Sequence, residues 1–152
     1  MTDEPINVLV LCTGNSARSV LAECLINDLG GGKWKAHSAG SRPTGNVNPL
    51  SIEILREKGH SVDGLRSKSW DEFALPGAPQ MDLVITVCDN AAGEVCPIWP
   101  GHPSKLHIGF PDPAVAEGSK ETQLAAFRGV YAMIEAKVRK LIEVGPQRAQ
   151  EI

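Results

Sequence analysis

Near its start the chain has a short aliphatic run, which is followed by a polar stretch and then by a helical pattern. The run Ile6–Leu11 has the length and composition of a parallel strand buried on both faces. Cys12 to Ser19 follows at once, and Val20 to Leu29 then has the pattern of a helix, which Gly30-Gly31-Gly32 ends. A strand that leads directly into a helix through a tight loop predicts an α/β domain.

The rest of the chain continues this alternation of strands and helices. Further strands are predicted at Trp34–Ala39, Leu83–Val87 and Lys105–Ile108, with helices at Pro49–Lys58, after Ser69, and from Ser119 to Gly145. The last helix carries an apolar stripe formed by Leu124, Phe127, Tyr131, Ile134, Val138 and Leu141. We therefore predict one three-layer α/β domain over residues 1–152, with a four-stranded parallel sheet.

Composition excludes several classes of partner. The chain has 152 residues and a formal net charge of −3, which argues against broad electrostatic capture of nucleic acid or of an anionic membrane. The N-terminus has neither the basic region nor the apolar core of a signal peptide, and no stretch is long enough to span a membrane. We expect a cytoplasmic monomer.

Four cysteines are present: Cys12, Cys24, Cys88 and Cys96. In a reducing compartment a structural disulfide framework is not expected. Cys88 and Cys96 belong to no C-x-x-C pair, so a zinc site completed by histidines such as His102 and His107 is only a weak alternative. Thiol chemistry is the better hypothesis. Cys24 lies on the apolar side of the first helix and is interpreted as a core residue.

The segment after the first strand has the form C-x5-R-S. A tight loop at a helix N-terminus turns backbone N–H groups inward and binds a tetrahedral anion. Gly14 permits a positive φ, Asn15 can hold the loop, and Arg18 supplies a planar cation that fits two oxygens. The same field favours the Cys12 thiolate, which Ser19 can hydrogen-bond. The predicted oxyanion-binding set is Thr13, Gly14, Asn15, Ser16, Ala17, Arg18 and Ser19.

A second thiol is predicted near this loop. Ligands of parallel α/β sheets bind at the carboxyl ends of the strands. Cys12 and Cys88 each follow directly after an apolar strand, so the fold would place both at the same edge of the sheet.

The loop and its context resemble the low-molecular-weight protein tyrosine phosphatase family, which keeps its C-x5-R-S loop after the first strand. The family's general acid is an Asp-Pro near the C-terminus, and this chain has Asp112-Pro113. Ser38-Ala39-Gly40 is similar to the family's second-strand motif. The resemblance runs from about Ile6 to the final helix, and it implies a phosphatase-like fold in which Cys12, Arg18 and Asp112 carry the chemistry.

This family contains both phosphatases and arsenate reductases, and the fold does not choose between them. In a phosphatase, water hydrolyses the thiol–phosphate ester. In a reductase, a second thiolate attacks the sulfur of the thiol–arsenate adduct, which requires Cα atoms within about 7 Å. Cys88-Asp89 followed by Cys96-Pro97 resembles the thioredoxin-coupled reductases. The resemblance implies a relay from Cys12 to Cys88 to Cys96, with no bound cofactor.

The resemblance also implies an external reductant, thioredoxin first and glutaredoxin with glutathione second. Aromatic walls suited to an aryl phosphate are missing from the sequence after Asp112-Pro113 and from Gly45 to Asn48, although Trp99 is unplaced. The prediction is therefore an arsenate reductase, with a tyrosine phosphatase as the main alternative. A module that only binds arsenic or senses redox state is the weakest alternative.

A few polar residues remain. Asn15, Glu23, Ser38 and Asp63 resemble positions that bind potassium in some reductases, although a network that supports the loop is the preferred interpretation, and no other metal is expected. Arg42, His60 and Arg66 are interpreted as surface residues.

Overall fold

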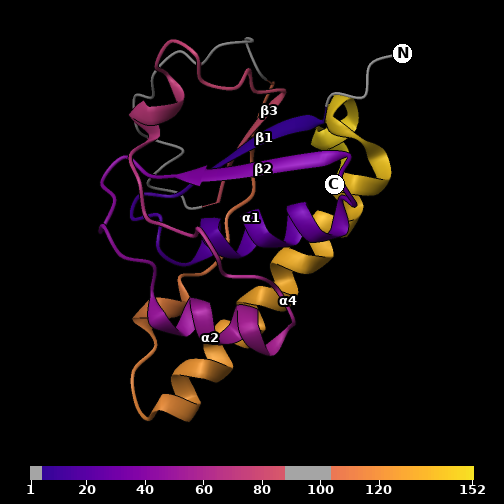
Figure 1. Ribbon diagram of the computed structural model, residues 1–152. Coiled ribbons are helices and arrows are strands. Elements are labelled where there is room, and N and C mark those ends of the chain that lie inside the picture. The colour runs from indigo at the N-terminus through magenta and orange to yellow at the C-terminus, as the bar shows by residue number, and fades with distance from the viewer. Residues whose placement is uncertain (1–4, 88–103) are drawn as a thin grey trace.

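The structure is a computed structural model that describes residues 5–87 and 104–152. Four strands form one sheet: β1 (Ile6–Leu11), β2 (Trp34–Ala39), β3 (Leu83–Thr86) and β4 (Ser104–His107). The α-helices are α1 (Arg18–Leu29), α2 (Pro49–Glu57) and α4 (Lys120–Val144), and short 3-10 helices are η1 (Trp70–Phe73), η2 (Pro113–Val115) and η3 (Pro146–Glu151). Figure 1 shows the three α-helices on one side of the sheet and η1 on the other.

The strands are parallel and lie in the order β2-β1-β3-β4. The first strand is central, and its Leu11 lies opposite both Ala39 of β2 and Thr86 of β3. The three strands therefore end level with one another at the edge where the chain leaves β1 for the loop. This confirms the predicted parallel sheet.

The sheet separates two apolar clusters because successive side chains of a strand point to opposite faces. Val8 and Val10 pack in the larger cluster with α1, α2 and α4, whereas Leu9 and Leu11 pack on the other face. Trp70, Phe73 and Met81 complete this smaller cluster. The four residues of β1 from Val8 to Leu11 are at most 1% exposed, as expected of a strand covered on both sides.

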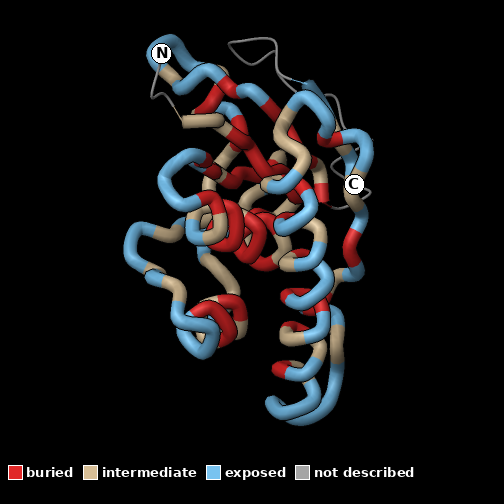
Figure 2. Tube along the Cα trace, turned by 90° about the vertical axis from the view of Figure 1, so that its right-hand side faces the viewer, coloured by how far each residue is buried: buried red, intermediate tan, exposed pale blue. Residues whose placement is uncertain are grey.

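The final helix has the predicted boundaries and the predicted inward face. Ser119 caps its start by accepting a hydrogen bond from the Thr122 N–H at 3.2 Å, and Gly145 ends it with φ of 87°. The six residues of the predicted stripe are all buried. Figure 2 shows buried and exposed residues alternating within the turns of this helix, so that one side is buried and the other exposed. Among the helices of residues 5–87 and 104–152, none has the length and apolar character needed to cross a bilayer.

The interpretation of His60 as a surface residue was wrong. Its side chain is only 7% exposed, and its Nδ1 contacts the Asp28 carboxylate. Its Nε2 lies 2.7 Å from the Tyr131 hydroxyl. His60 therefore joins α1 and α4 through the segment after α2. Nothing in the local sequence signals this, because both partners are distant along the chain. Arg42 and Arg66 are exposed as expected.

Cys24 lies in the core, as predicted. Burial, with smaller contributions from Glu23 and Asp28, raises the pKa of its thiol from 9.0 to about 12. Burial likewise raises the pKa of Tyr131 from 10.0 to about 12. Both groups keep their protons in the folded chain at a pH where the unfolded chain loses them.

This arrangement predicts a loss of stability at alkaline pH. Between about pH 9 and pH 12 the unfolded state binds fewer protons at Cys24, so the free energy of unfolding should fall by about 1.4 kcal/mol per pH unit for that group. Tyr131 adds a similar fall above about pH 10. Urea unfolding of wild type and Cys24→Ala at several pH values checks this, since the variant should lose stability less steeply. Parallel curves for the two proteins would contradict it.

Candidate active site

The loop from Cys12 to Ala17 begins at the end of β1 and ends at α1. The Cys12 N–H donates to the Ala39 carbonyl at 3.2 Å, so the ladder between β1 and β2 holds the first residue of the loop. Cys12 is 6% exposed and belongs to the larger core cluster. The candidate nucleophile is thus fixed at the carboxyl end of the central strand, where the sequence placed it.

The carbonyl groups of this loop are bonded to the surrounding chain. The Thr13 carbonyl accepts from the Arg42 N–H at 3.0 Å. The Gly14 carbonyl accepts from the Thr44 N–H at 3.1 Å and from the Ser67 hydroxyl at 3.0 Å. The Ser16 carbonyl accepts from the Asn48 N–H and from the Ser51 hydroxyl, both at 3.0 Å. Serines 51 and 67 were not predicted, since a lone serine distant along the chain carries no local signal.

The backbone N–H groups of the loop differ from its carbonyls, because most of them have no bonded partner in the described residues. For Gly14, Asn15, Ser16 and Ala17, no acceptor of the backbone N–H occurs within the described part of the chain. Ala17 is the N-cap of α1 and provides no side-chain hydrogen bond to the first turn. Helices usually begin with a side chain that satisfies these donors. A loop with its carbonyls engaged outside and its amides unpaired at a helix N-terminus is suited to an anion.

Asn15 holds the bend of the loop. It has φ of 48° and is completely buried. Its Nδ2 donates to the Ser19 hydroxyl at 2.9 Å, and its Oδ1 accepts from the Lys68 N–H at 2.9 Å. The prediction of a positive φ at Gly14 was wrong. Asparagine tolerates the left-handed region better than most residues, and here two buried hydrogen bonds fix it there.

Arg18 projects from the first turn of α1 toward the segment after β4. Its Nη1 donates to the Phe110 carbonyl at 2.9 Å, and its Nη2 lies 3.6 Å from the Asp112 carboxylate. Its Nε is buried and has no hydrogen-bond partner among residues 5–87 and 104–152. A buried unsatisfied donor is costly unless a ligand completes it. An anion in the loop would supply the missing acceptor for this Nε.

Asp112 begins the short helix η2 and is partly exposed. Its Oδ1 accepts from the Ala114 N–H at 2.9 Å, and its Oδ2 faces Arg18. The structure thus brings together the arginine and the acid that the sequence had placed 94 residues apart, 112 minus 18. The carboxylate has one oxygen tied to the backbone and the other directed at the loop's cation.

Gly40 lies directly against the loop. A Cβ atom at this position would lie 2.4 Å from the Thr13 carbonyl oxygen and 2.6 Å from that of Cys12. Both contacts involve backbone, which cannot move without deforming the loop. Only glycine therefore fits at the end of the Ser38-Ala39-Gly40 motif.

The residues considered for potassium form a different arrangement. Ser38 donates a short hydrogen bond to the Glu23 carboxylate, and the Lys68 ammonium lies 4.0 Å from the same carboxylate. Burial raises the pKa of Glu23, and it lowers the pKa of Lys68. Asp63 is exposed and bonds only to Ser61 among the described residues. The four residues do not fit a common cation site, because a lysine supplies the positive charge beside Glu23. Ser38, Glu23 and Lys68 form a polar contact that reaches the loop through the Lys68 N–H, which donates to Asn15.

Cys88, Cys96, His102 and Trp99 lie outside the described residues. The nearest described position is Val87, whose N–H donates to the Leu11 carbonyl at 2.9 Å. Leu11 and Val87 are the residues that directly precede Cys12 and Cys88. His107, weighed as a zinc ligand, has its Nδ1 2.8 Å from the Thr86 hydroxyl. No cluster of three metal-binding side chains occurs in residues 5–87 and 104–152.

The fold and the loop define a known class of protein. The family model for low molecular weight phosphotyrosine protein phosphatase matches residues 7–150, and the chain belongs to this family. An arsenate reductase of Halalkalibacterium halodurans is 38% identical over 138 residues, which cover 91% of this chain and 96% of the relative.

Solved structures of arsenate reductases are also similar to this chain. An arsenate reductase from Archaeoglobus fulgidus has a TM-score of 0.69 at 31% identity, and the match covers 90% of this chain and 98% of that one. A thioredoxin-dependent arsenate reductase of Corynebacterium glutamicum has a TM-score of 0.64 at 26% identity, covering 94% of this chain and 65% of that one.

Replacing Arg18 by lysine tests the anion site. Lysine keeps the positive charge but loses the planar fork and the Nε donor. We expect the affinity for inorganic phosphate, measured by calorimetry, to fall about 10- to 100-fold, the usual loss for one or two hydrogen bonds to a charged group. Arg139→Lys, at an exposed position of α4, should bind phosphate like the wild type. Equal affinity in both variants would exclude Arg18 from the anion site.

A matched pair at Asn15 separates backbone conformation from hydrogen bonding. Both Asn15→Gly and Asn15→Ala remove the bonds to Ser19 and Lys68, but only glycine adopts a positive φ without strain. In urea unfolding, both variants should be less stable than wild type, and the alanine variant should be the less stable of the two by about 1 kcal/mol. An alanine variant as stable as the glycine variant would show that φ at this position is not strained.

Proposed function

We propose that this protein reduces arsenate to arsenite through three cysteines. The strongest support is the preformed oxyanion loop that begins at Cys12. Leu11, directly before Cys12, accepts a backbone hydrogen bond from Val87, directly before Cys88. The loop binds arsenate, and attack by the second thiol reduces it.

In the first step arsenate occupies the loop and the Cys12 thiolate attacks arsenic. The amides of Gly14 to Ala17, which have no acceptor among the described residues, and the Arg18 guanidinium bind its oxygens, and the helix N-terminus adds to the positive field. The field also favours thiolate over thiol at Cys12. Asp112, held opposite Arg18, gives a proton to the oxygen that leaves as the sulfur–arsenic bond forms.

In the second step the Cys88 thiolate attacks the sulfur of Cys12. A sulfur–sulfur bond forms while the sulfur–arsenic bond breaks, and its electron pair leaves with arsenic, which departs as arsenite. The two sulfurs are thereby oxidised and arsenic is reduced by two electrons. Cys96 then attacks Cys88, which releases the Cys12 thiolate and leaves a Cys88–Cys96 disulfide.

The geometry of the described neighbours supports this step. Leu11 and Thr86 are paired across the sheet, and the Val87 N–H bonds to the Leu11 carbonyl. Val87 is thus held beside Leu11, the residue directly before the loop, and Cys88 follows Val87 directly in the sequence. A disulfide needs Cα atoms within about 7 Å, and the parallel pairing of Leu11 with Thr86 supports the proposal that Cys88 can meet this requirement.

The surroundings of the acid favour a small inorganic substrate. In the segment after Asp112, η2 carries Pro113, Ala114 and Val115, and Val115 is 71% exposed. None of these side chains is aromatic, so this segment provides no aromatic wall for an aryl group. An external dithiol then regenerates the enzyme. We propose thioredoxin, in line with the similarity to a thioredoxin-dependent reductase, with glutaredoxin and glutathione second. The cytoplasm would keep the thiols reduced between turnovers.

Substituting the two later cysteines separates the steps. With thioredoxin, thioredoxin reductase and NADPH, wild type should consume NADPH in proportion to arsenate, whereas Cys88→Ser should lose this turnover because nothing attacks the adduct. Cys96→Ser should complete one reduction and stop with a Cys12–Cys88 disulfide, which mass spectrometry of peptides detects. Cys24→Ser is the control and should turn over normally. Equal turnover by wild type and Cys88→Ser would refute the relay.

The main alternative is a phosphotyrosine phosphatase, which the family membership itself allows. It predicts fast aryl-phosphate hydrolysis that survives Cys88→Ser, together with no arsenite production. A module that only binds arsenic would take up a stoichiometric amount and stop, so multiple turnovers by wild type exclude it.

A further inference from the structure

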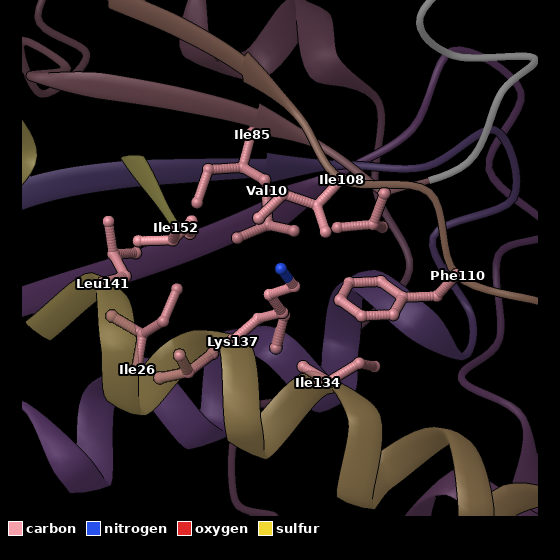
Figure 3. A pocket seen from close by; sticks show the side chains of 12 residues that line it. Val10, Ile26, Ile85, Ile108, Phe110, Ile134, Lys137, Leu141 and Ile152 are labelled. Atoms are coloured by element: carbon pink, nitrogen blue, oxygen red, sulfur yellow. The ribbon is translucent and has the colours of Figure 1, made fainter. Parts of the chain in front are cut away.

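Among residues 5–87 and 104–152, Lys68 and Lys137 are the only lysines that are not exposed, and they differ in what they meet. Lys137 borders a small pocket between the sheet and the helices α1 and α4, and the eleven other residues that line it are apolar (Figure 3). Lys68 meets polar groups. Its ammonium lies 4.0 Å from the Glu23 carboxylate and donates to the Arg66 carbonyl at 3.3 Å. The side chains of Lys68 and Glu23 are only 10% and 16% exposed. Because taking two charges out of water costs free energy, this pair by itself is expected to add little stability.

The backbone of Lys68 holds two residues that shape the oxyanion loop. Its N–H donates to the Asn15 Oδ1 at 2.9 Å, and its carbonyl accepts from the Gly40 N–H at 2.9 Å. Asn15 carries the positive φ of the loop, and Gly40 lies directly against the start of the loop. Lys68 is therefore connected to the loop at two points that fix its shape.

The side chain of Lys68 reaches the same helix that supports the loop. Ser19 accepts from the Asn15 Nδ2 at 2.9 Å. Glu23 follows Ser19 by four residues in α1, so the two are neighbours on one face of the helix. The Lys68 N–H is bonded to Asn15 and the Lys68 ammonium lies beside Glu23. These contacts close a ring that begins and ends at Lys68.

The charges in this ring depend on one another. Burial raises the pKa of Glu23, and the Ser38 hydroxyl and the cations Lys68 and Arg66 oppose that rise. Burial lowers the pKa of Lys68, and the carboxylates of Glu23 and Glu72 oppose that fall against Arg66. Without the ammonium, Glu23 would place a negative charge one helical turn after the C-x5-R-S segment. Such a charge disfavours both a thiolate and a bound anion.

We propose that Lys68 is a positioning residue for Cys12: its backbone holds the loop in its bent form, and its ammonium offsets Glu23 so that the thiolate and the incoming anion are favoured. This role rests on the proposed use of Cys12 as the nucleophile. Lys68 acts through Asn15 and Glu23 and has no chemical step of its own. Since any residue at this position supplies the two backbone bonds, the positive side chain is what lysine adds.

Substitutions at Lys68 separate its charge from its backbone bonds. Lys68→Met keeps the backbone donor and acceptor but removes the ammonium, whereas Lys68→Arg keeps the positive charge. The readout is the rate at which iodoacetamide alkylates Cys12 as a function of pH, followed by mass spectrometry of the Cys12 peptide. The midpoint of this profile should rise by about one pH unit in Lys68→Met, the usual size for a lost charge partner, and stay close to that of wild type in Lys68→Arg.

Substitutions at Glu23 test the sign of the effect. Glu23→Gln removes the opposing carboxylate and keeps the ammonium, so the midpoint should fall, and Glu23→Gln combined with Lys68→Met should return it toward wild type. Lys140→Met, at an exposed position of α4, is the control and should match wild type. An unchanged Cys12 midpoint in Lys68→Met overturns the proposal, even where urea unfolding shows a loss of stability. If Lys68→Met does not fold, Glu23→Gln decides, and a midpoint at or above that of wild type overturns the proposal.

These measurements use no arsenate, so they separate this role from the proposed function. If the Cys12 midpoint moves as expected and no arsenite is formed, the positioning role stands and the reductase proposal fails. If the Cys88-dependent reduction is observed and the midpoint does not move, only the positioning role fails.

Discussion

The hydrogen bonds that pull the carbonyl groups of the Cys12 loop outward are the constraint on which the site depends. Each carbonyl that is bonded from outside leaves the neighbouring N–H groups to face the opposite side, and these amides then lie at the N-terminus of α1. The free energy for this arrangement comes from distant segments, such as Ser51 and Ser67. The anion site is thus preorganised by the surrounding fold and does not require the anion to shape it.

Part of this structure follows from local sequence, and part does not. The run Ile6–Leu11 and the stripe of α4 are visible because burial on a strand or a helix repeats with a short period. The left-handed residue was misplaced at Gly14 because what fixes Asn15 is Lys68, which lies 53 positions away. His60 was misplaced for the same reason. Long-range hydrogen bonds leave no periodic trace in a sequence.

The two activities within this family share everything up to the covalent adduct. In the proposed mechanism Cys12, Arg18 and Asp112 would serve phosphate and arsenate alike, so the loop by itself does not separate a phosphatase from a reductase. The choice is kinetic, between water and a thiol as the next nucleophile. The pairing of β1 with β3 affects this choice, because it places the end of β3 beside the end of β1, where the loop begins.

Gly40 has a consequence for how this protein tolerates change over evolutionary time. A Cβ atom on it would collide with the backbone carbonyls of Cys12 and Thr13, so any side chain there would deform the start of the loop without entering it. Such a position admits no gradual drift through larger residues. The end of β2 therefore behaves as part of the active centre even though it contributes no chemical group to it.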